Sequence, residues 1–89
     1  MANRRNDNTE TVSFNAEEFR QANIRQILHH VQEALDERGY NSINQLAGYL
    51  ISNDPAYISS NKNARSIIQS VDRTEIIEEL VRFYLKESK

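Results

Sequence analysis

Apolar residues recur at spacings of three and four along the first half of the chain, from about residue 16 to residue 38. These positions are Phe19, Ile24, Ile27, Leu28, Val31, Ala34 and Leu35. Such spacing places side chains on one stripe of an α-helix. Gly39 follows the stripe and can take the left-handed conformation that often ends a helix. The pattern therefore predicts one long amphipathic helix that stops just before Gly39.

A second apolar group predicts a second helix, for which Ser42 is placed as the N-cap. The group consists of Ile43, Leu46, Ala47, Leu50 and Ile51. Asn53-Asp54-Pro55 ends this helix, because the residue before a proline avoids the α region. Asp54 as a cap and Pro55 at the first helical position suit a short new turn that runs through Ile58. A tight corner is therefore expected after the second helix.

The last third of the chain predicts two more helices. Ser59, Ser60 or Asn61 can cap the third, and Asp72 with Glu75 three residues later resembles a capping box for the fourth. The third helix carries Ala64, Ile67, Ile68 and Val71, and the fourth carries Ile76, Ile77, Leu80, Val81, Phe83, Tyr84 and Leu85. No strand pattern competes. The sequence predicts an all-α fold, a small bundle of four main helices with a short extra turn and a helix-turn-helix-like corner.

The first fifteen residues differ in composition from the rest. Beyond the initiator Met they contain only Val12 and Phe14 as sizeable apolar side chains, too few to offset the entropy lost on ordering. We therefore expect a disordered regulatory tail over residues 1–15 and a helical dimerising domain over residues 16–89. The hydroxyls of Thr9, Thr11 and Ser13 would then be accessible to a kinase.

Length and composition narrow the class of protein. A chain of 89 residues fits one domain and buries a small fraction of its surface, which favours a homodimer. With no Cys there is no disulfide, thiolate zinc site or thiol nucleophile. No apolar run approaches the roughly 20 residues that span a bilayer, and residues 1–8 lack the apolar segment of a signal peptide. We expect a cytoplasmic protein without membrane association.

The charge balance disfavours nucleic acid as a partner. With 11 basic and 13 acidic side chains the formal net charge is −2, so the positive field behind most non-specific nucleic-acid affinity is missing. The corner between the second and third helices nonetheless invites a helix-turn-helix interpretation. Its candidate recognition helix would offer Lys62, Asn63, Arg65 and Gln69 to DNA. A DNA-binding transcriptional regulator is therefore the alternative to a protein-binding regulator.

Catalytic and metal chemistry find little support in the sequence. His29 and His30 are adjacent on a helix and about 100° apart around its axis, so they cannot share one metal ion. The carboxylates Glu17, Glu18, Glu78 and Glu79 lie in helical runs, where a solvated face or a helix N-terminus explains them. Neither Gly39 nor Gly48 belongs to a phosphate-cradling loop. We therefore expect no enzyme, no metal and no cofactor.

Four residues of the body are candidates for partner binding. Lys62, Arg65 and Arg73 cluster around the third helix, with Asp72 as the only acid between Ser59 and Arg73. This weak basic patch is either an ordinary solvated helix face or a docking surface for a partner. Tyr57 is the fourth candidate, because tyrosines of the body either pack with the hydroxyl on a polar group or lie at an interface.

A string of short ordered motifs carries a resemblance to a known family. The motifs are Gly39-Tyr40-Asn41, Ile43-Asn44-Gln45, Gly48-Tyr49-Leu50, Asp54-Pro55-Ala56-Tyr57-Ile58, Ala64-Arg65 and Glu75-Ile76-Ile77-Glu78-Glu79-Leu80-Val81. Over about residues 11–85 the chain resembles the IreB family of regulatory phosphoproteins from Gram-positive bacteria. The resemblance implies a helical homodimer, phosphorylated on a tail threonine by a membrane Ser/Thr kinase with extracellular PASTA repeats. It also implies a role in control of peptidoglycan synthesis, in some members through Clp-dependent proteolysis of an early pathway enzyme.

The same resemblance assigns the phosphorylation site. The family's tail has a Thr followed by a hydrophobic residue, any residue and an aromatic, and Thr11-Val12-Ser13-Phe14 fits this pattern. Thr11 is the implied phosphosite and Thr9 the second choice. The chain departs from the family in its corner, where Ser59-Ser60-Asn61 and Gln69-Ser70 stand in a region that is usually more basic. Fewer charges then remain there to meet an acidic partner or a phosphate.

Overall fold

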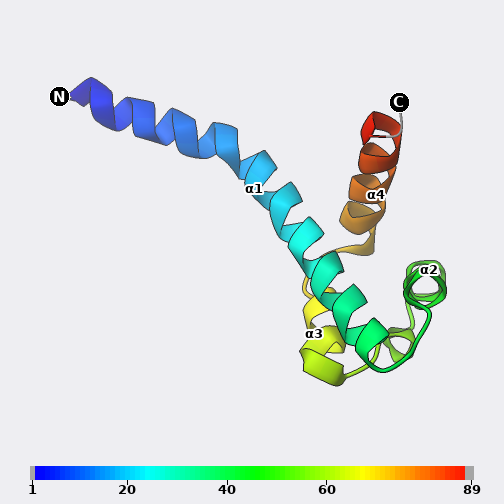
Figure 1. Cartoon of the computed structure of the whole chain (residues 1–89). Coiled ribbons are helices and arrows are strands. Elements are labelled where there is room, and N and C mark those ends of the chain that lie inside the picture. Colours follow the sequence, from blue (N-terminus) through cyan, green and yellow to red (C-terminus); the bar gives the residue numbers. More distant parts are fainter. Residues whose placement is uncertain (1, 88–89) are drawn as a thin grey trace.

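The computed structural model describes the backbone of residues 2–87 and the side chains of residues 16–86. Its elements are α1 (Ala2–Glu37), α2 (Ser42–Ser52), two single-turn 3₁₀ helices η1 (Pro55–Tyr57) and η2 (Asn61–Asn63), α3 (Ala64–Ile68) and α4 (Arg73–Glu87). Residues 2–87 contain no strand, and four α-helices with a short extra turn confirm the predicted all-α fold (Figure 1).

Helix α1 is the support on which the other elements pack. Helices α2, α3 and α4 each contact it, and they do so along its C-terminal half (Figure 1). The sequence predicts the start of this helix near residue 16, whereas α1 begins at Ala2. The stretch from residue 2 to residue 37 contains neither Gly nor Pro, the residues that interrupt helices most strongly. The division of the chain at residue 15 into tail and domain stays a prediction.

The core forms where the stripe of α1 meets the other helices. Its buried members are Ile24, Ile27, Val31, Ala34, Leu35, Tyr49, Ile58, Ala64, Ile68 and Ile76. Five of the seven predicted stripe positions of α1 are among them, with Leu28 packed against the cluster. Phe19 is the exception, with 76% of its surface exposed. The stripe therefore begins before the part of α1 that the other helices cover.

The turn between α1 and α2 agrees with the prediction at Gly39 and corrects it at Ser42. Gly39 has φ +80°, the left-handed conformation expected there. The N-cap of α2 is Asn41, whose Oδ1 accepts a hydrogen bond from the backbone of Asn44 at 3.0 Å. Ser42 is instead the first residue of the helix and is buried, with its hydroxyl donating to the carboxylate of Asp36. Its hydroxyl therefore ties α2 to α1 rather than capping α2.

The corner after α2 forms as its sequence predicts. Asn53 ends α2 in the left-handed conformation, and its N–H donates to the carbonyl of Tyr49 at 2.7 Å. Asp54 caps η1 by accepting a hydrogen bond from Ala56 N at 3.0 Å, with Pro55 at the first helical position. The chain then enters the core at the buried residue Ile58.

The third helix is shorter than predicted and starts differently. Two consecutive residues, Lys62 and Asn63, have φ values of 55° and 62°, so helical geometry cannot run from η2 into α3. Asn63 takes the N-cap position of α3 without a side-chain capping bond. The expected caps act locally instead, because Ser59 Oγ accepts a hydrogen bond from Asn61 N at 3.0 Å. Helix α3 consequently has only five residues.

Candidate functional site

The predicted phosphosites Thr9 and Thr11 lie in the first part of α1, outside residues 16–86, for which the structure describes side chains. Their assignment therefore stays a prediction. The other predicted site residues lie in the body, at the corner and at the start of α4.

Lys62 faces the C-terminal end of α1. Its Nζ lies 3.5 Å from a carboxylate oxygen of Glu37 and 3.9 Å from one of Glu33. Its carbonyl oxygen is hydrogen-bonded to His30 Nε2 at 2.8 Å. The ammonium charge of Lys62 is thus shared with two carboxylates of α1, and the left-handed turn at Lys62 is held against the same helix.

Asn61 joins the corner to the last turn of α1. Its Nδ2 donates to Ala34 O at 3.1 Å and to Glu37 Oε1 at 2.8 Å, and its Oδ1 accepts from Arg38 at 3.2 Å. The hydrogen bond from Asn61 is the main cause that lowers the pKa of the exposed Glu37 carboxyl, followed by the charge of Lys62. The charged form of Glu37 is therefore favoured in the folded protein.

The two arginines predicted to bind a partner donate hydrogen bonds to backbone carbonyls. Arg65 donates from Nε to Ile58 O at 2.8 Å, and Arg73 donates from Nη1 to Leu50 O at 2.7 Å. Lys62, Arg65 and Arg73 thus each contact a different segment, so each of them supports a turn of the fold. A recognition helix of five residues with these cations already engaged gives the helix-turn-helix alternative little support.

Tyr57 fastens η1 to α2. Its ring lies over Gly48 so closely that a Cβ at that position would be 2.4 Å from Tyr57 Cε1. Its carbonyl oxygen accepts a hydrogen bond from Gln45 Nε2 at 2.9 Å. Tyr57 is nonetheless 40% exposed, so part of this residue remains accessible to a partner.

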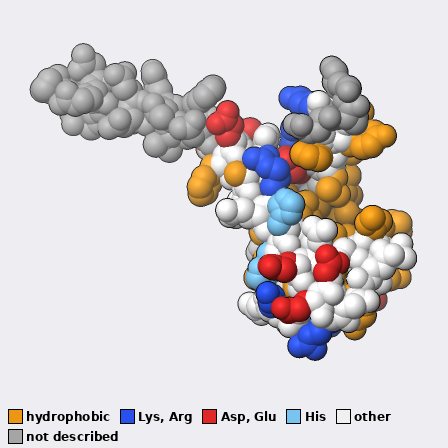
Figure 2. Space-filling view, in the orientation of Figure 1, with side chains coloured by type: hydrophobic (Ala, Val, Ile, Leu, Met, Phe, Trp, Pro, Cys, Tyr) orange, Lys and Arg blue, Asp and Glu red, His pale blue; other side chains and the backbone are white. Residues whose placement is uncertain are grey.

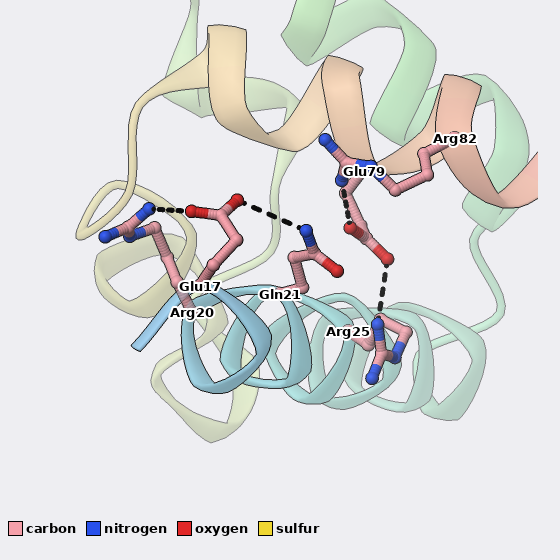
Figure 3. Close-up of polar contacts among 6 residues, drawn as sticks. All are labelled: Glu17, Arg20, Gln21, Arg25, Glu79 and Arg82. Carbon is pink, nitrogen blue, oxygen red and sulfur yellow. Dashed lines mark hydrogen bonds and ion pairs between the residues drawn. The ribbon is translucent and has the colours of Figure 1, made fainter. Parts of the chain in front are cut away.

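A buried carboxylate between α1 and α4 pairs with two arginines. Glu79 Oε2 accepts a hydrogen bond from Arg25 Nη1 at 3.0 Å, and its Oε1 accepts one from Arg82 Nη1 at 2.7 Å (Figure 3). The Glu79 side chain is only 4% exposed, against 47% for Arg25 and 34% for Arg82. We call these three residues the Arg-Glu-Arg cluster. It anchors α4 to α1 and carries a net charge of +1.

The interpretation of Glu79 as part of a solvated face is wrong. Glu79 follows the fully buried Ile76 by three residues on α4, a spacing that puts both on the same face of a helix. An acid at that spacing is the signal that the sequence offers, because a buried carboxylate needs a cationic partner. The identity of that partner depends on the packing of α1 against α4, which local spacing does not encode.

An apolar groove lies beside the cluster and measures about 310 Å³. Its walls come from α1, α2 and α4, and its lining residues are Arg25, Leu28, His29, Gln32, Ser42, Ile43, Leu46, Leu50, Glu79, Leu80 and Phe83. Hydrophobic side chains also continue over the surface of α4 (Figure 2). The exposed ones on this helix are Ile77, Leu80, Val81, Phe83, Tyr84 and Leu85.

Apolar surface on this scale is typical of a small helical protein that binds other proteins. Among the described residues, no group of three or more His, Cys, Asp or Glu side chains could hold a metal ion, and no helix is long and apolar enough to cross a membrane.

A family model described as IreB regulatory phosphoprotein matches residues 9–86, nearly the whole chain. The chain belongs to the IreB family of regulatory phosphoproteins, a description that names a regulator and not an enzyme.

Proposed function

We propose that this protein is a phosphorylation-controlled adaptor that a PASTA-type Ser/Thr kinase modifies on Thr11, with Thr9 as the second site. One observation carries the proposal: the family match begins at residue 9 and so includes both threonines. The pattern Thr11-Val12-Ser13-Phe14 supports the choice of Thr11. A phosphate would add about −1.5 to −2 charges and three acceptor oxygens to a segment that is otherwise nearly neutral.

The test is kinase treatment of the full chain in four forms. Wild type, Thr11→Ala, Thr9→Ala and the control Thr74→Ala are incubated with the PASTA kinase of the host and mapped by mass spectrometry. Thr74 lies in the first turn of α4 and is exposed, so it reports accidental modification of the body. We expect Thr11→Ala to lose most of the phosphate and Thr74→Ala to lose none. Equal modification of Thr11→Ala and wild type would reject the site.

We further propose that the adaptor is a homodimer formed through the outer face of α4. This face consists of Ile77, Val81, Tyr84 and Leu85, which are 41%, 51%, 69% and 62% exposed. Their spacing of four, three and one places them on one side of the helix. A chain of this size has a small core of its own, and a second copy covering the outer face would remove this apolar surface from water.

Sedimentation tests the dimer. Val81→Glu places a charge on the outer face without entering the core, and Thr74→Glu places the same charge in the first turn of α4, where an acid is favoured. We expect wild type and Thr74→Glu to sediment as dimers at micromolar concentration and Val81→Glu as a monomer. A wild-type mass equal to one chain, 10.4 kDa, contradicts the proposal.

Downstream, we propose that the adaptor acts in control of peptidoglycan synthesis through regulated proteolysis, with the Clp protease machinery as the partner. Support comes from the family resemblance. The partner-binding candidates are Lys62, Arg65, Arg73 and Tyr57. Deletion of the gene should change the cellular half-life of an early enzyme of peptidoglycan synthesis, and re-expression of Thr11→Ala should give a half-life that no longer responds to the kinase. An unchanged half-life in the deletion strain rejects this route.

A further inference from the structure

The Arg-Glu-Arg cluster holds more positive than negative charge. Two guanidinium groups share the single carboxylate of Glu79, and that carboxylate is buried whereas both arginines reach solvent. A guanidinium carries five N–H donors. Arg25 and Arg82 each direct Nη1 to Glu79, so in the part of the chain with described side chains their Nη2 and Nε donors are left for another acceptor. An incoming anion would find a net charge of +1 and a fork of oriented donors.

Arg20 provides the comparison on the same helix. It donates from Nη1 to Glu17 Oε1 at 2.6 Å, and Gln21 donates to the other oxygen of that carboxylate at 3.2 Å (Figure 3). The Arg20 and Glu17 side chains are 51% and 59% exposed and their charges match one to one. Arg20 thus lacks the surplus charge and the buried anchor that distinguish Arg25.

The phosphorylatable segment of the tail matches the surface of α1 in length. Three extended residues, from Thr11 to Phe14, cover about 10 Å. Six helical residues, from Phe19 to Arg25, cover about 9 Å. A tail that turns back at residue 16 therefore brings Phe14 to the level of Phe19 when Thr11 reaches the level of Arg25. A shallow hollow follows this path, lined by Glu18, Phe19, Gln21, Ala22 and Arg25.

Turning back requires residues 11–15 to leave α1. Residues 6–15 read NDNTETVSFN, and all of them except Glu10 have lower helix propensity than Ala, Leu, Lys or Glu. Unwinding this part of the helix is therefore cheap. In exchange, Phe14 would stack on Phe19, which is 76% exposed, and the phosphate would meet two guanidinium groups.

We propose that phosphorylated Thr11 folds back along α1 and binds Arg25 and Arg82 through its phosphate, with Phe14 packed on Phe19. This inference rests on the proposed function for the identity of the phosphosite. The phosphate converts the tail into a strap across the junction of α1 and α4, beside the apolar groove. The unphosphorylated tail lacks the charge that holds it there, so the junction is open in one state and covered in the other.

A synthetic peptide of residues 6–16 tests the site without the kinase. Calorimetry measures its binding to the unphosphorylated full chain, with and without phosphate on Thr11, and with inorganic phosphate as a separate arm. We expect the phosphopeptide to bind at least about tenfold more tightly than the plain peptide. Inorganic phosphate should bind more weakly than the phosphopeptide, since it lacks the aromatic contact.

Variants of the full chain identify the residues. Arg25→Gln and Arg82→Gln should each weaken phosphopeptide binding by roughly tenfold, whereas Arg20→Gln should leave it within about twofold. Arg25→Lys keeps a positive charge beside Glu79 and so guards against loss of folding. Circular dichroism checks that each variant is folded. The affinity of Arg25→Lys for the phosphopeptide should lie between those of wild type and Arg25→Gln. Glu79→Gln should tighten binding, because both arginines lose their competing carboxylate.

If the cluster only stabilised the fold, all three cluster substitutions would weaken phosphopeptide binding. Tighter binding by Glu79→Gln therefore distinguishes an anion site from a purely structural role. Equal binding of the two peptides overturns the proposal. So does an equal loss in Arg20→Gln, or a loss in Arg65→Gln that Arg25→Gln does not show. The kinase assay is independent: phosphate on Thr11 with no binding here refutes the strap alone, and no phosphate on Thr11 refutes the assigned phosphosite.

Discussion

Replacing Asn61 with alanine should detach the corner from the end of α1. The amide of Asn61 is the donor to the part-buried carbonyl of Ala34, one of the last-turn carbonyls that a helix leaves without an intrahelical partner. The residue four positions on, Arg38, donates its N–H to Leu35 O instead. A part-buried carbonyl deprived of its donor costs about 1 to 2 kcal/mol. The contacts of Asn61 with Glu37 and Arg38 are at the surface, so the expected loss of stability comes from the Ala34 carbonyl.

Thermal denaturation followed by far-UV circular dichroism measures this loss. In a domain of this size 1 kcal/mol shifts the melting temperature by about 4 to 8 °C, so Asn61→Ala should melt roughly 4 to 16 °C below wild type at the same protein concentration. Asn23→Ala is the matched control, because Asn23 is an exposed residue inside α1 and alanine favours a helix. It should melt at or slightly above the wild-type temperature.

The pKa of Glu37 gives a second readout of the same substitution. Hydrogen bonding from Asn61 lowers this pKa first, and Lys62 lowers it further. A lowered folded-state pKa contributes stability that is present above the unfolded value, about 4.3, and is lost as the pH falls through the folded value. Asn61→Ala should therefore raise the Glu37 pKa toward its ordinary value in a carbon-detected NMR titration, and its stability deficit should narrow below about pH 4. An unchanged Glu37 pKa together with an unchanged melting temperature would show that Asn61 does not hold the corner against α1.

Three further substitutions test the packing and the caps by equilibrium denaturation in urea. Gly48→Ala should lower the free energy of unfolding by about 1 to 2 kcal/mol despite the better helix propensity of alanine, because its Cβ meets the Tyr57 ring at 2.4 Å. Adding Tyr57→Ala should remove this loss. A single Gly48→Ala variant that is more stable than wild type would contradict the close packing. Asn41→Ala should cost about 1 kcal/mol through loss of the α2 cap, and no loss would show that the cap is dispensable. Leu35→Ala, at a fully buried position, should lower the free energy of unfolding by about 2 to 5 kcal/mol. A loss below about 1 kcal/mol would place Leu35 outside the core.

Local sequence rules predict the elements of this fold better than they predict its polar contacts. The apolar stripe of α1, the stop at Gly39 and the short turn at Pro55 depend on neighbours within about four residues. Each is present, with Phe19 as the one stripe position that stays exposed. Local rules assign a local partner to a side chain that could also form a hydrogen bond with a distant segment. Ser42 shows this, because it bonds to α1 rather than capping α2.

The candidate site divides in the same way. The three basic residues could be named from the sequence, but not their partners: the carbonyls of Ile58 and Leu50, which lie 7 and 23 residues from their arginines, and a carboxylate of α1. Arg25 and Glu79 are 54 residues apart, so their pairing follows only from the packing of α4 on α1. The tail carries its signal in the sequence alone, through the Thr-Val-Ser-Phe pattern that the family resemblance assigns to phosphorylation.

Helix α1 contacts α2, α3 and α4, whereas the main contacts of α2 and α3 outside α1 are with the adjacent single turns η1 and η2. The chain is therefore organised like a hub with three spokes. Away from the groove that α2 and α4 line together, substitutions on the outward faces of different spokes share few neighbours, and distant independent sites have additive effects on the free energy of unfolding. A spoke substitution combined with one on the buried stripe of α1 should instead be non-additive. Surface residues of one spoke that lie outside this groove can then diverge to suit a new partner without compensating changes on the other two.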